Sequence, residues 1–175
     1  KNKLSIHEAD SLMGRPMGIP KTGIFGLYDL IGIDLMSDVV DTLGKILPPD
    51  DQFHNVGSKN LAVNPLIQKM IKEGYTGNKG KGGFYRQDNE EKIFMVDINS
   101  KKILPKENII PKKASIATEK LSRGEETLFD LINSTTDDVR DKQHTVFCRN
   151  VLGRILGYAA SLIPEITTSP QDIDD

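Results

Sequence analysis

Residues 22–49, which read TGIFGLYDLIGIDLMSDVVDTLGKILPP, indicate a helical fold. Apolar side chains recur at three- and four-residue spacing on both sides of Gly32, which predicts two consecutive amphipathic helices. Asp34 is the expected N-cap of the second helix, and Pro48 with Pro49 ends it because proline cannot continue a helix. The fold class predicted from this stretch is mainly α.

The sequence on either side of this stretch adds further helices. Ser5 and Glu8 have the spacing of a capping box, in which each side chain binds the free backbone N–H of the other residue, so a short helix begins there. Residues 14–21 contain two glycines and two prolines and are expected to form a rigid, non-helical loop. Asn64 followed by Pro65 predicts the start of another helix.

The second half of the chain contains the strand signals and the longest helix. Three short apolar runs, separated by polar turn residues, predict a small antiparallel β-hairpin or meander over 84–86, 93–98 and 102–104. Residues 105–113 form a basic linker that contains proline. Further helices are expected over 115–121, 125–133 and 139–163.

The composition is that of an ordinary folded domain. The 175 residues carry 23 Lys and Arg against 25 Asp and Glu, for a net charge of -2 and a pI near 6.0. This balance leaves no excess of positive charge to neutralise phosphates, which disfavours a nucleic-acid partner. The single cysteine, Cys148, cannot form an internal disulfide, and no run approaches the ~20 apolar residues of a membrane span, so a cytoplasmic location is expected.

The segment 74–83, GYTGNKGKGG, combines glycines with two lysines, a composition that suits a phosphate-binding loop. A P-loop requires a glycine five residues before the Gly-Lys pair, but Tyr75 occupies that position ahead of Gly80, and the segment follows a helix instead of a strand. Two interpretations remain open. Either the glycines end a helix and turn the chain into the hairpin, or the lysines face a ligand.

Other residues with chemical potential favour structural roles. His144 and Cys148 are four residues apart on the last long helix, but no orienting group or oxyanion site accompanies them, so Cys148 is expected in the core. Asp29 and Asp34 are interpreted as helix caps in preference to an acid-base pair. His54 lacks the accompanying ligands of a metal site. The sequence predicts no catalytic residue and no metal ligand in this chain.

The C-terminal residues repeat a pattern from the first helix. Ser169 and Asp172 have the same spacing as Ser5 and Glu8, and both pairs are followed by an apolar and then an acidic residue. An internal duplication produces such a repeat. The chain is therefore expected to contain one unit without its leading portion, followed by the leading portion of a second unit.

The predicted domain organisation follows from this repeat. Residues 1–104 form a first helical unit that lacks its leading helix and includes the hairpin, and residues 105–175 form a linker and the leading helices of a truncated second unit. The apolar face of the helix over 139–163 has lost its own partners in this scheme. We expect that face to pack onto the first unit, either within the chain or by exchange between chains.

Three motifs in the same order resemble the C-terminal helical domain of 3-hydroxyacyl-CoA dehydrogenases: GRPMG at 14–18, FGLYDLIGID at 25–34, and GNK at 77–79 with GFY at 83–85. In that family the pieces read Gly-x-Pro-x-Gly, Asp-x-x-Gly-x-Asp and Gly-x-Lys-(Ser/Thr)-Gly-x-Gly-Phe-Tyr. The resemblance implies a helical fold like the C-terminal domain of 6-phosphogluconate dehydrogenase, with a small antiparallel β-hairpin. Residues 157–166 further resemble large bacterial members, which carry two copies of the helical domain and commonly an enoyl-CoA hydratase domain.

The resemblance also implies an activity and a few site residues. The family oxidises an L-3-hydroxyacyl-CoA to the 3-ketoacyl-CoA and passes a hydride to NAD, which the Rossmann domain binds. Lys79 matches the lysine that reaches NAD from the helical domain. Pro16, Met17 and Gly18 match a loop near the substrate cleft.

The sequence departs from the family pattern in two respects. Gly80 and Lys81 stand where the family has Ser/Thr and Gly, which removes a hydroxyl contact from the turn. No strand followed by Gly-x-Gly-x-x-Gly occurs, so the Rossmann domain and its catalytic histidine are expected upstream of Lys1, and the chain alone is predicted to be inactive.

The resemblance therefore implies a fragment of a dehydrogenase of fatty-acid β-oxidation, which closes the cleft over the acyl chain. Its expected partners are the 3-hydroxyacyl-CoA substrate, its own Rossmann and hydratase domains, and a second copy in a homodimer. The alternative is a non-enzymatic helical interaction module, in which the same apolar stripes bind a partner protein.

Overall fold

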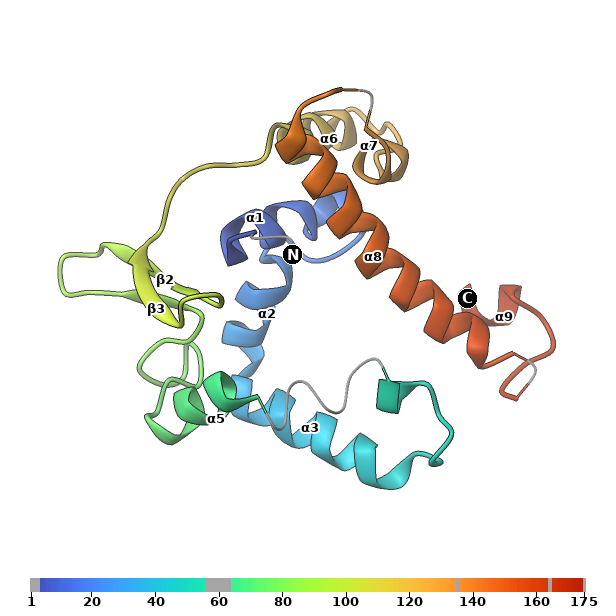
Figure 1. Cartoon of the computed structure of the whole chain (residues 1–175), viewed down its shortest axis with the longest axis horizontal. Helices are drawn as coiled ribbons and strands as arrows, with labels where there is room; N and C mark the ends of the chain where they lie inside the picture. Colours follow the sequence, from blue (N-terminus) through green and yellow to red (C-terminus); the bar gives the residue numbers. More distant parts are fainter. Residues whose placement is uncertain (1–3, 56–63, 135, 164, 175) are drawn as a thin grey trace.

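The computed structural model describes residues 4–55, 64–134, 136–163 and 165–174. Helices dominate the fold, and a small three-stranded sheet lies at one side (Figure 1). The helices are α1 (Ile6–Leu12), the 3-10 helix η1 (Arg15–Met17), α2 (Gly23–Ile31), α3 (Ile33–Ile46), α5 (Pro65–Lys72), α6 (Lys112–Ser122), α7 (Leu128–Ile132), α8 (Val139–Ser161) and α9 (Gln171–Asp174). The strands are β1 (Tyr85–Gln87), β2 (Ile93–Asp97) and β3 (Lys102–Pro105). The mainly α fold class is confirmed.

Local capping signals define the ends of two helices as predicted. The Ser5 hydroxyl accepts the Glu8 N–H at 3.2 Å, and the Glu8 carboxylate accepts the Ser5 N–H at 2.9 Å, which completes the capping box of α1. The Asn64 side chain accepts the Leu66 N–H at 2.9 Å at the start of α5.

Three local predictions are wrong. Asp34 does not cap α3, because that helix begins directly after Gly32, whose φ of 116° turns the chain, and Asp34 lies in the first turn. The loop over 14–21 contains the single helical turn η1, which tolerates Pro16 because a residue in a first turn needs no N–H partner. The linker ends early, since α6 begins directly after Pro111.

The sheet has the predicted antiparallel meander topology. Its order is β1-β2-β3, and Met95 of β2 lies opposite Tyr85 of β1 and Leu104 of β3. Met95 and Val96 are buried against the helices, whereas β3 is exposed along its length. The sheet therefore covers one side of the helical core and leaves β3 at the surface.

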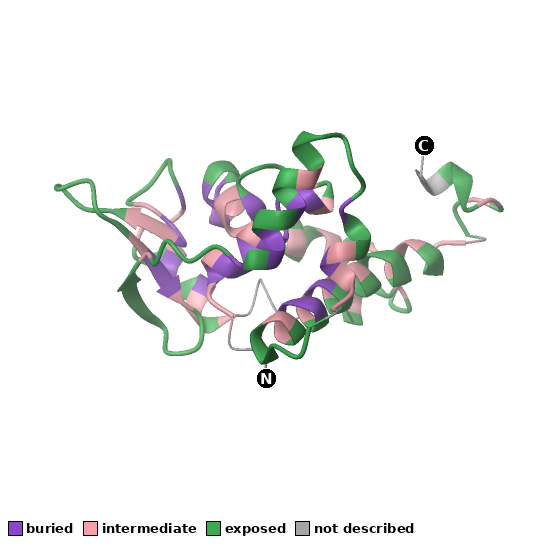
Figure 2. Ribbon diagram, turned by 90° about the horizontal axis from the view of Figure 1, so that it is seen from above, coloured by how far each residue is buried: buried purple, intermediate pink, exposed green. Residues whose placement is uncertain are grey.

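The apolar core consists of two clusters, which appear as the buried segments of Figure 2. The first joins α1, α3, α5 and the sheet region through Ile6, Ile33, Ile67, Met70, Phe84, Met95 and Val96. The second joins α1 to α6, α7 and α8 through Leu12, Ala114, Ala117, Leu131 and Cys148. The first cluster lies within residues 1–104, whereas the second contains residues from both sides of the predicted domain boundary.

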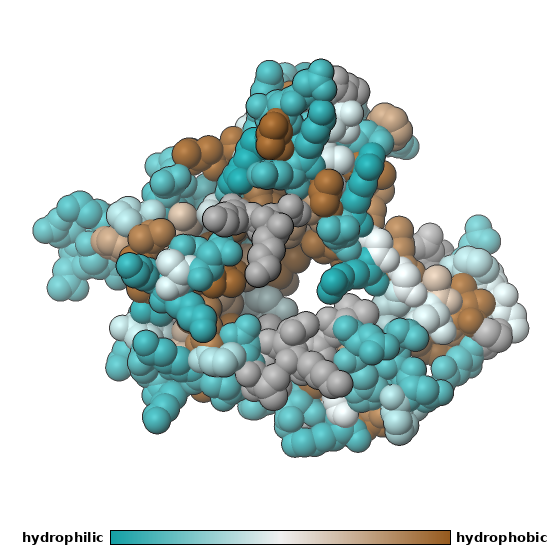
Figure 3. Space-filling model, in the orientation of Figure 1, coloured by the Kyte–Doolittle hydropathy of each residue, from teal (hydrophilic) through white to brown (hydrophobic). Residues whose placement is uncertain are grey.

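Helix α8 packs on the rest of the chain along only part of its length. His144, Thr145 and Cys148 are buried, and Arg140 and His144 contact Glu8 of α1. Ile155, one to two turns further on, is half exposed, and apolar residues reach the surface along the course of α8 (Figure 3). The expected packing onto the first unit is thus present in the first half of α8 and absent from the described surroundings of Ile155.

Candidate functional site

Two of the three motif segments, 25–34 and 77–85, meet at Asp29 of α2. Its carboxylate accepts the backbone N–H groups of Phe84 at 2.8 Å and Tyr85 at 2.7 Å, and its carbonyl oxygen accepts the Asn78 N–H at 2.7 Å. Burial raises the pKa of Asp29, although the two N–H donors oppose the shift. Asp29 is neither a helix cap nor half of an acid-base pair. It ties the glycine-rich turn to α2.

Asp10 of α1 holds a second set of donors beside Asp29. Its carboxylate accepts the N–H groups of Phe25 at 2.7 Å and Gly26 at 3.1 Å, and the Tyr85 hydroxyl donates to it at 2.8 Å. Asp10 therefore satisfies the free N–H groups at the start of α2. Burial beside Asp10 raises the pKa of the Tyr85 hydroxyl, which keeps that group a donor.

The glycines of the turn are needed for close approach to Asp29. A Cβ atom on Gly83 would lie 1.9 Å from an Asp29 carboxylate oxygen, and one on Gly77 would lie 2.3 Å from the Asp29 carbonyl oxygen. Gly77 also has a φ of 108°, which only glycine adopts readily. Of the two interpretations left open by the sequence, the turn into the hairpin accounts for these two glycines.

The two lysines of the turn contact different helices. Lys79 lies 2.9 Å from the Asp34 carboxylate at the start of α3, and its ammonium lowers the pKa of Asp34. Lys81 instead donates to the Glu73 carbonyl oxygen at 3.1 Å, at the end of α5. Lys79 stays about half exposed at 51% of its side chain. Its ammonium is therefore available to a ligand that outcompetes Asp34.

Exposed apolar residues lie around the Lys79–Asp34 pair. Leu30 and Ile31 end α2, Leu35 follows Asp34 in α3, and all three are exposed. The junction between α2 and α3 therefore presents one ammonium group beside an apolar surface. We call Leu30, Ile31, Asp34, Leu35 and Lys79 the junction face.

The predicted substrate loop lies elsewhere in the fold. Pro16 is buried, and its carbonyl oxygen accepts the Thr127 hydroxyl at 2.7 Å, while Met17 packs against the second core cluster. Gly18 is exposed and has a φ of 77°. The structure thus places Pro16 and Met17 under α6 and α7 and places Lys79 at the junction face. It does not bring the two predicted sites into contact.

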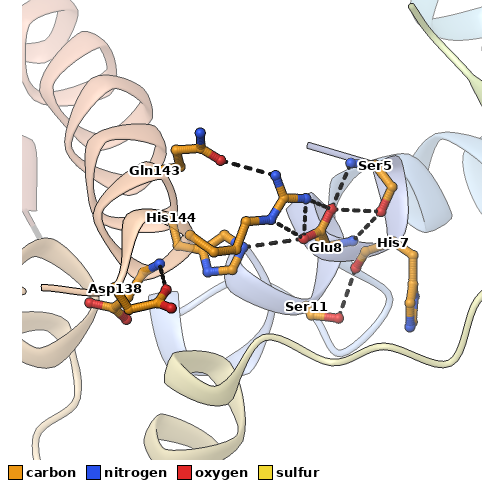
Figure 4. A network of polar contacts seen from close by, with 9 residues as sticks. Ser5, His7, Glu8, Ser11, Asp138, Gln143 and His144 are labelled. Atoms are coloured by element: carbon orange, nitrogen blue, oxygen red, sulfur yellow. Dashed lines mark hydrogen bonds and ion pairs between the residues drawn. The ribbon is translucent and has the colours of Figure 1, made fainter. Parts of the chain in front are cut away.

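An ionic cluster that the sequence did not reveal joins α1 to α8, with Glu8 and His144 buried and Arg140 half-exposed (Figure 4). Arg140 Nε donates to Glu8 at 2.9 Å, its terminal nitrogen contacts both carboxylate oxygens, and His144 Nε2 lies 3.3 Å from Glu8. Burial alone would raise the pKa of Glu8, but hydrogen bonds from Arg140, the Ser5 N–H and His144 lower it to about 2. Glu8 is therefore anionic at neutral pH.

Glu8, Arg140 and His144 also line an open pocket with a volume of about 1220 Å³. Apolar walls come from the sheet, the linker and α6, and include Met95, Val96, Ile110 and Ile116. Six carboxylate residues line the pocket against Lys112, Lys113 and Arg140, so its lining is acidic overall. An acidic lining is unsuited to the phosphates of a coenzyme A or dinucleotide.

The remaining candidates have structural surroundings. Cys148 is fully buried, and burial raises its pKa to about 11, which confirms its place in the core and keeps the thiol protonated. A ring nitrogen of His54 lies 2.9 Å from the Pro48 carbonyl oxygen. Among the described residues, no group of three or more His, Cys, Asp or Glu side chains is placed to hold a metal ion. Within that same part of the chain, each helix is too short or too polar to cross a membrane.

Comparison with known proteins gives both a family match and longer relatives. Residues 1–87 match the model of the 3-hydroxyacyl-CoA dehydrogenase, C-terminal domain. A protein of Rickettsia felis that carries the name fatty acid oxidation complex trifunctional enzyme is 34% identical over 174 residues, which cover 98% of this chain and 21% of that protein. A protein of the same name in Rickettsia prowazekii is 32% identical over 171 residues, with 98% and 21% covered.

A third relative carries a single-enzyme name. A protein of Deinococcus radiodurans named 3-hydroxyacyl-CoA dehydrogenase is 29% identical over 92 residues, which cover 53% of this chain and 24% of that protein. The chain spans 21% of the length of the two Rickettsia relatives, and no solved structure matches it significantly. The two motif segments that meet at Asp29 lie inside the matched residues, and residues 1–87 belong to the family of the 3-hydroxyacyl-CoA dehydrogenase C-terminal domain.

Proposed function

We propose that this chain serves an NAD-dependent L-3-hydroxyacyl-CoA dehydrogenase of fatty-acid oxidation, as the helical part that closes the cleft over the acyl chain. Two comparisons with known proteins support this proposal. The matched domain bears the dehydrogenase name, and the Rickettsia relatives bear the name of a fatty acid oxidation complex. The compartment we expect is the cytoplasm, and the other domains we expect beside this one are a Rossmann domain and an enoyl-CoA hydratase domain.

The observation that carries this proposal is the junction face. It offers a half-exposed ammonium, Lys79, next to exposed Leu30, Ile31 and Leu35. An ammonium on a flexible stem suits a phosphate or a hydroxyl-rich group, and the apolar side chains suit an acyl chain or an opposing domain. The junction face is therefore the surface that we assign to the cleft.

The residues of this chain fit one contact to NAD and not a complete NAD site. NAD, when bound, would accept the hydride from the substrate. Lys79 would donate to it after releasing Asp34, and Gly32 leaves room for that movement because its missing Cβ would lie 2.7 Å from the Lys79 ammonium. Phosphate binding by a glycine-rich strand-to-helix turn has no counterpart in the sequence.

The role proposed for the 16–18 loop is narrower. Pro16 is buried, so it would act by fixing the loop, whereas Gly18 and the partly exposed Met17 are placed at its accessible edge. We keep Pro16, Met17 and Gly18 as the proposed substrate loop. The Thr127 hydroxyl donates to the Pro16 carbonyl oxygen and so links this loop to the start of α7. If the loop moves toward a substrate, α7 must therefore move with it.

The test compares this chain alone with the same chain joined to its Rossmann domain. We expect the joined protein to reduce NAD with 3-hydroxybutyryl-CoA. The isolated chain should show no such activity, and calorimetric titration should detect no binding of NAD to it. Micromolar NAD binding by the isolated chain would contradict the proposal that the Rossmann domain provides most of the NAD site. Failure of the joined, folded protein to oxidise any 3-hydroxyacyl-CoA would contradict the function itself and favour the interaction module.

A further inference from the structure

The open pocket between the sheet and α6 has no part in the proposed dehydrogenase function. Most of its lining residues follow residue 87, where the family match ends. Among the described residues that line it, none belongs to the junction face or to the 16–18 loop. Its volume of about 1220 Å³ exceeds the ~300–1,000 Å³ that is usual for small-molecule sites. An open pocket of this size suits a segment of polypeptide better than a small molecule.

The pocket carries apolar side chains that the chain itself leaves uncovered. Ile109 and Ile110 line it from the linker between β3 and α6, and Phe129 lines it from α7. All three are exposed, and Phe129 is exposed over 71% of its surface. Apolar side chains that gather around a concave surface are typical of an interaction site. The pocket is therefore suited to a ligand with apolar groups of its own.

The acidic groups of the pocket are only partly neutralised. Three of its six carboxylates are paired with cations: Glu8 with Arg140, Asp130 with Lys120 at 2.7 Å, and Asp141 with Lys113 at 3.6 Å. The other three, Asp97, Glu107 and Asp138, have no cationic partner within the part of the chain that the structure describes. Lys112 is the one lining cation left unpaired in that part. The remaining charge therefore favours a cationic ligand.

An open backbone edge borders the same pocket. β3 is the last strand of the sheet, so one of its edges has no strand partner among the described residues. The backbone groups of residues 107–110, which follow β3, form no hydrogen bond within the described part of the chain. Leu104, Ile109 and Ile110 line the pocket, which brings this edge to its rim. Unpaired N–H and C=O groups at a sheet edge can pair with the backbone of another chain.

We propose that this pocket binds an extended, basic segment of a partner protein. The segment adds to the edge formed by β3 and residues 107–110, a recurring mode of peptide recognition. Its apolar side chains contact Ile110 and Phe129, and its cationic side chains lie near Glu107 and Asp138. The proposal concerns a surface apart from the junction face, so it does not depend on dehydrogenase activity.

The first test measures binding of a defined peptide by fluorescence anisotropy. The probe is a labelled peptide of about six alternating lysine and leucine residues, the length of a common strand. We expect saturable, micromolar binding that weakens with added salt. A glutamate–leucine peptide should not bind, and a lysine–serine peptide should bind at least about tenfold more weakly. Lack of saturable binding by the probe, or equal binding of the lysine–serine peptide, overturns the proposal.

The second test locates the site on the protein. Glu107→Lys should raise the dissociation constant of the probe about threefold to tenfold, because it replaces an attraction by a repulsion. Asp38→Lys is the matched control, since it changes the net charge equally at an exposed position of α3 outside the pocket. Ile110→Ser should weaken binding, whereas Ile46→Ser at the exposed end of α3 should not. Equal effects within either pair of variants would mean non-specific attraction and overturn the assigned site.

The third test asks whether the ligand pairs through its backbone and comes from another protein. A probe with N-methyl groups on alternate residues keeps its side chains but loses N–H donors, and it should bind at least about tenfold more weakly. Unchanged affinity would overturn the pairing with the open edge. The unmodified probe should bind equally well to the chain joined to its Rossmann domain. Loss of binding there would show that another part of the enzyme fills the pocket and would overturn the proposal of a separate partner.

Discussion

Glu8 takes part in two contacts that depend on its negative charge. It closes the capping box of α1 with Ser5, and it binds Arg140 and His144 of α8 from 132 and 136 residues away. One carboxylate therefore stabilises a helix start and the contact between the two ends of the chain.

Glu8→Gln should destabilise the fold by about 1–3 kcal/mol at pH 7, the range for a charged hydrogen bond with a partly exposed partner. The folded pKa of about 2 lies below the ordinary glutamate value of 4.5, so this stabilisation is complete above about pH 4.5 and is lost as the pH falls toward 2. Urea unfolding of the wild-type chain and of Glu8→Gln from pH 7 to pH 2.5 measures the difference between their free energies of unfolding. Glu119→Gln is the control, because Glu119 pairs with Arg123 at the exposed surface and should change stability little at any pH.

Lys79 and Lys81 differ in their contacts and should differ in effect. In the protein joined to its Rossmann domain, Lys79→Ala should raise the KM for NAD about tenfold to a hundredfold, because one charged hydrogen bond contributes about 1.5–3 kcal/mol. Lys81→Ala should leave it unchanged, since Lys81 binds the end of α5. Steady-state kinetics decides, and the reverse result would show that the NAD contact belongs to Lys81.

Gly83 should not tolerate a side chain. Gly83→Ala puts a methyl group where Asp29 accepts the Phe84 and Tyr85 N–H groups, and we expect a loss of about 2–4 kcal/mol of unfolding free energy. Gly153→Ala in α8 meets nothing within 4 Å and should instead stabilise the chain by about 0.5–1 kcal/mol. Thermal unfolding of the two variants gives the comparison, and equal effects would contradict the role assigned to the turn.

At the scale of elements, local sequence signals predicted the helices and strands. The contacts between residues that are distant in the sequence could not be predicted in this way. Ser5 and Asn64 cap helices through bonds to residues two or three positions away, which spacing reveals. Asp29 bonds residues 55 and 56 positions away, so its local sequence suggested a cap that it does not form. The Glu8–Arg140 pair lies further still, and no periodicity could have joined its two helices.

Helix α7 depends on a buried lysine of α6. Lys113 donates to the carbonyl oxygens of Asp130 and Asn133 at the end of α7, and it lies 3.6 Å from Asp141 of α8. Lys113→Met leaves these acceptors without a donor and should cost about 2–3 kcal/mol, with faster hydrogen exchange in α7. Lys112→Met is the matched control, because Lys112 is the exposed neighbour in the same turn. Equal exchange in the two variants would show that α7 does not rely on Lys113.

At the scale of the whole molecule, the two predicted units share one of the two cores. Leu12 and Met17 pack with Ala117 and Cys148, and Glu8 pairs with Arg140, so residues from both sides of position 104 hold the second cluster together. The boundary at residue 104 therefore stays a prediction about where one repeated unit ends and the next begins in the sequence. The shared core predicts that residues 1–104 and 105–175 stay associated.

Cleavage of the linker tests that association. Ile109 and Ile110 are exposed at 61% and 55%, so a protease site placed at 107–110 should be cut without unfolding the chain. We expect the two pieces to elute together under native conditions, because separation would expose the second core and leave Glu8 without its contacts to Arg140 and His144. Arg140→Ala combined with His144→Ala should weaken the association and release the C-terminal piece at lower urea. Separation of the wild-type pieces in buffer alone would mean that the linker, and not the shared core, keeps the two units together.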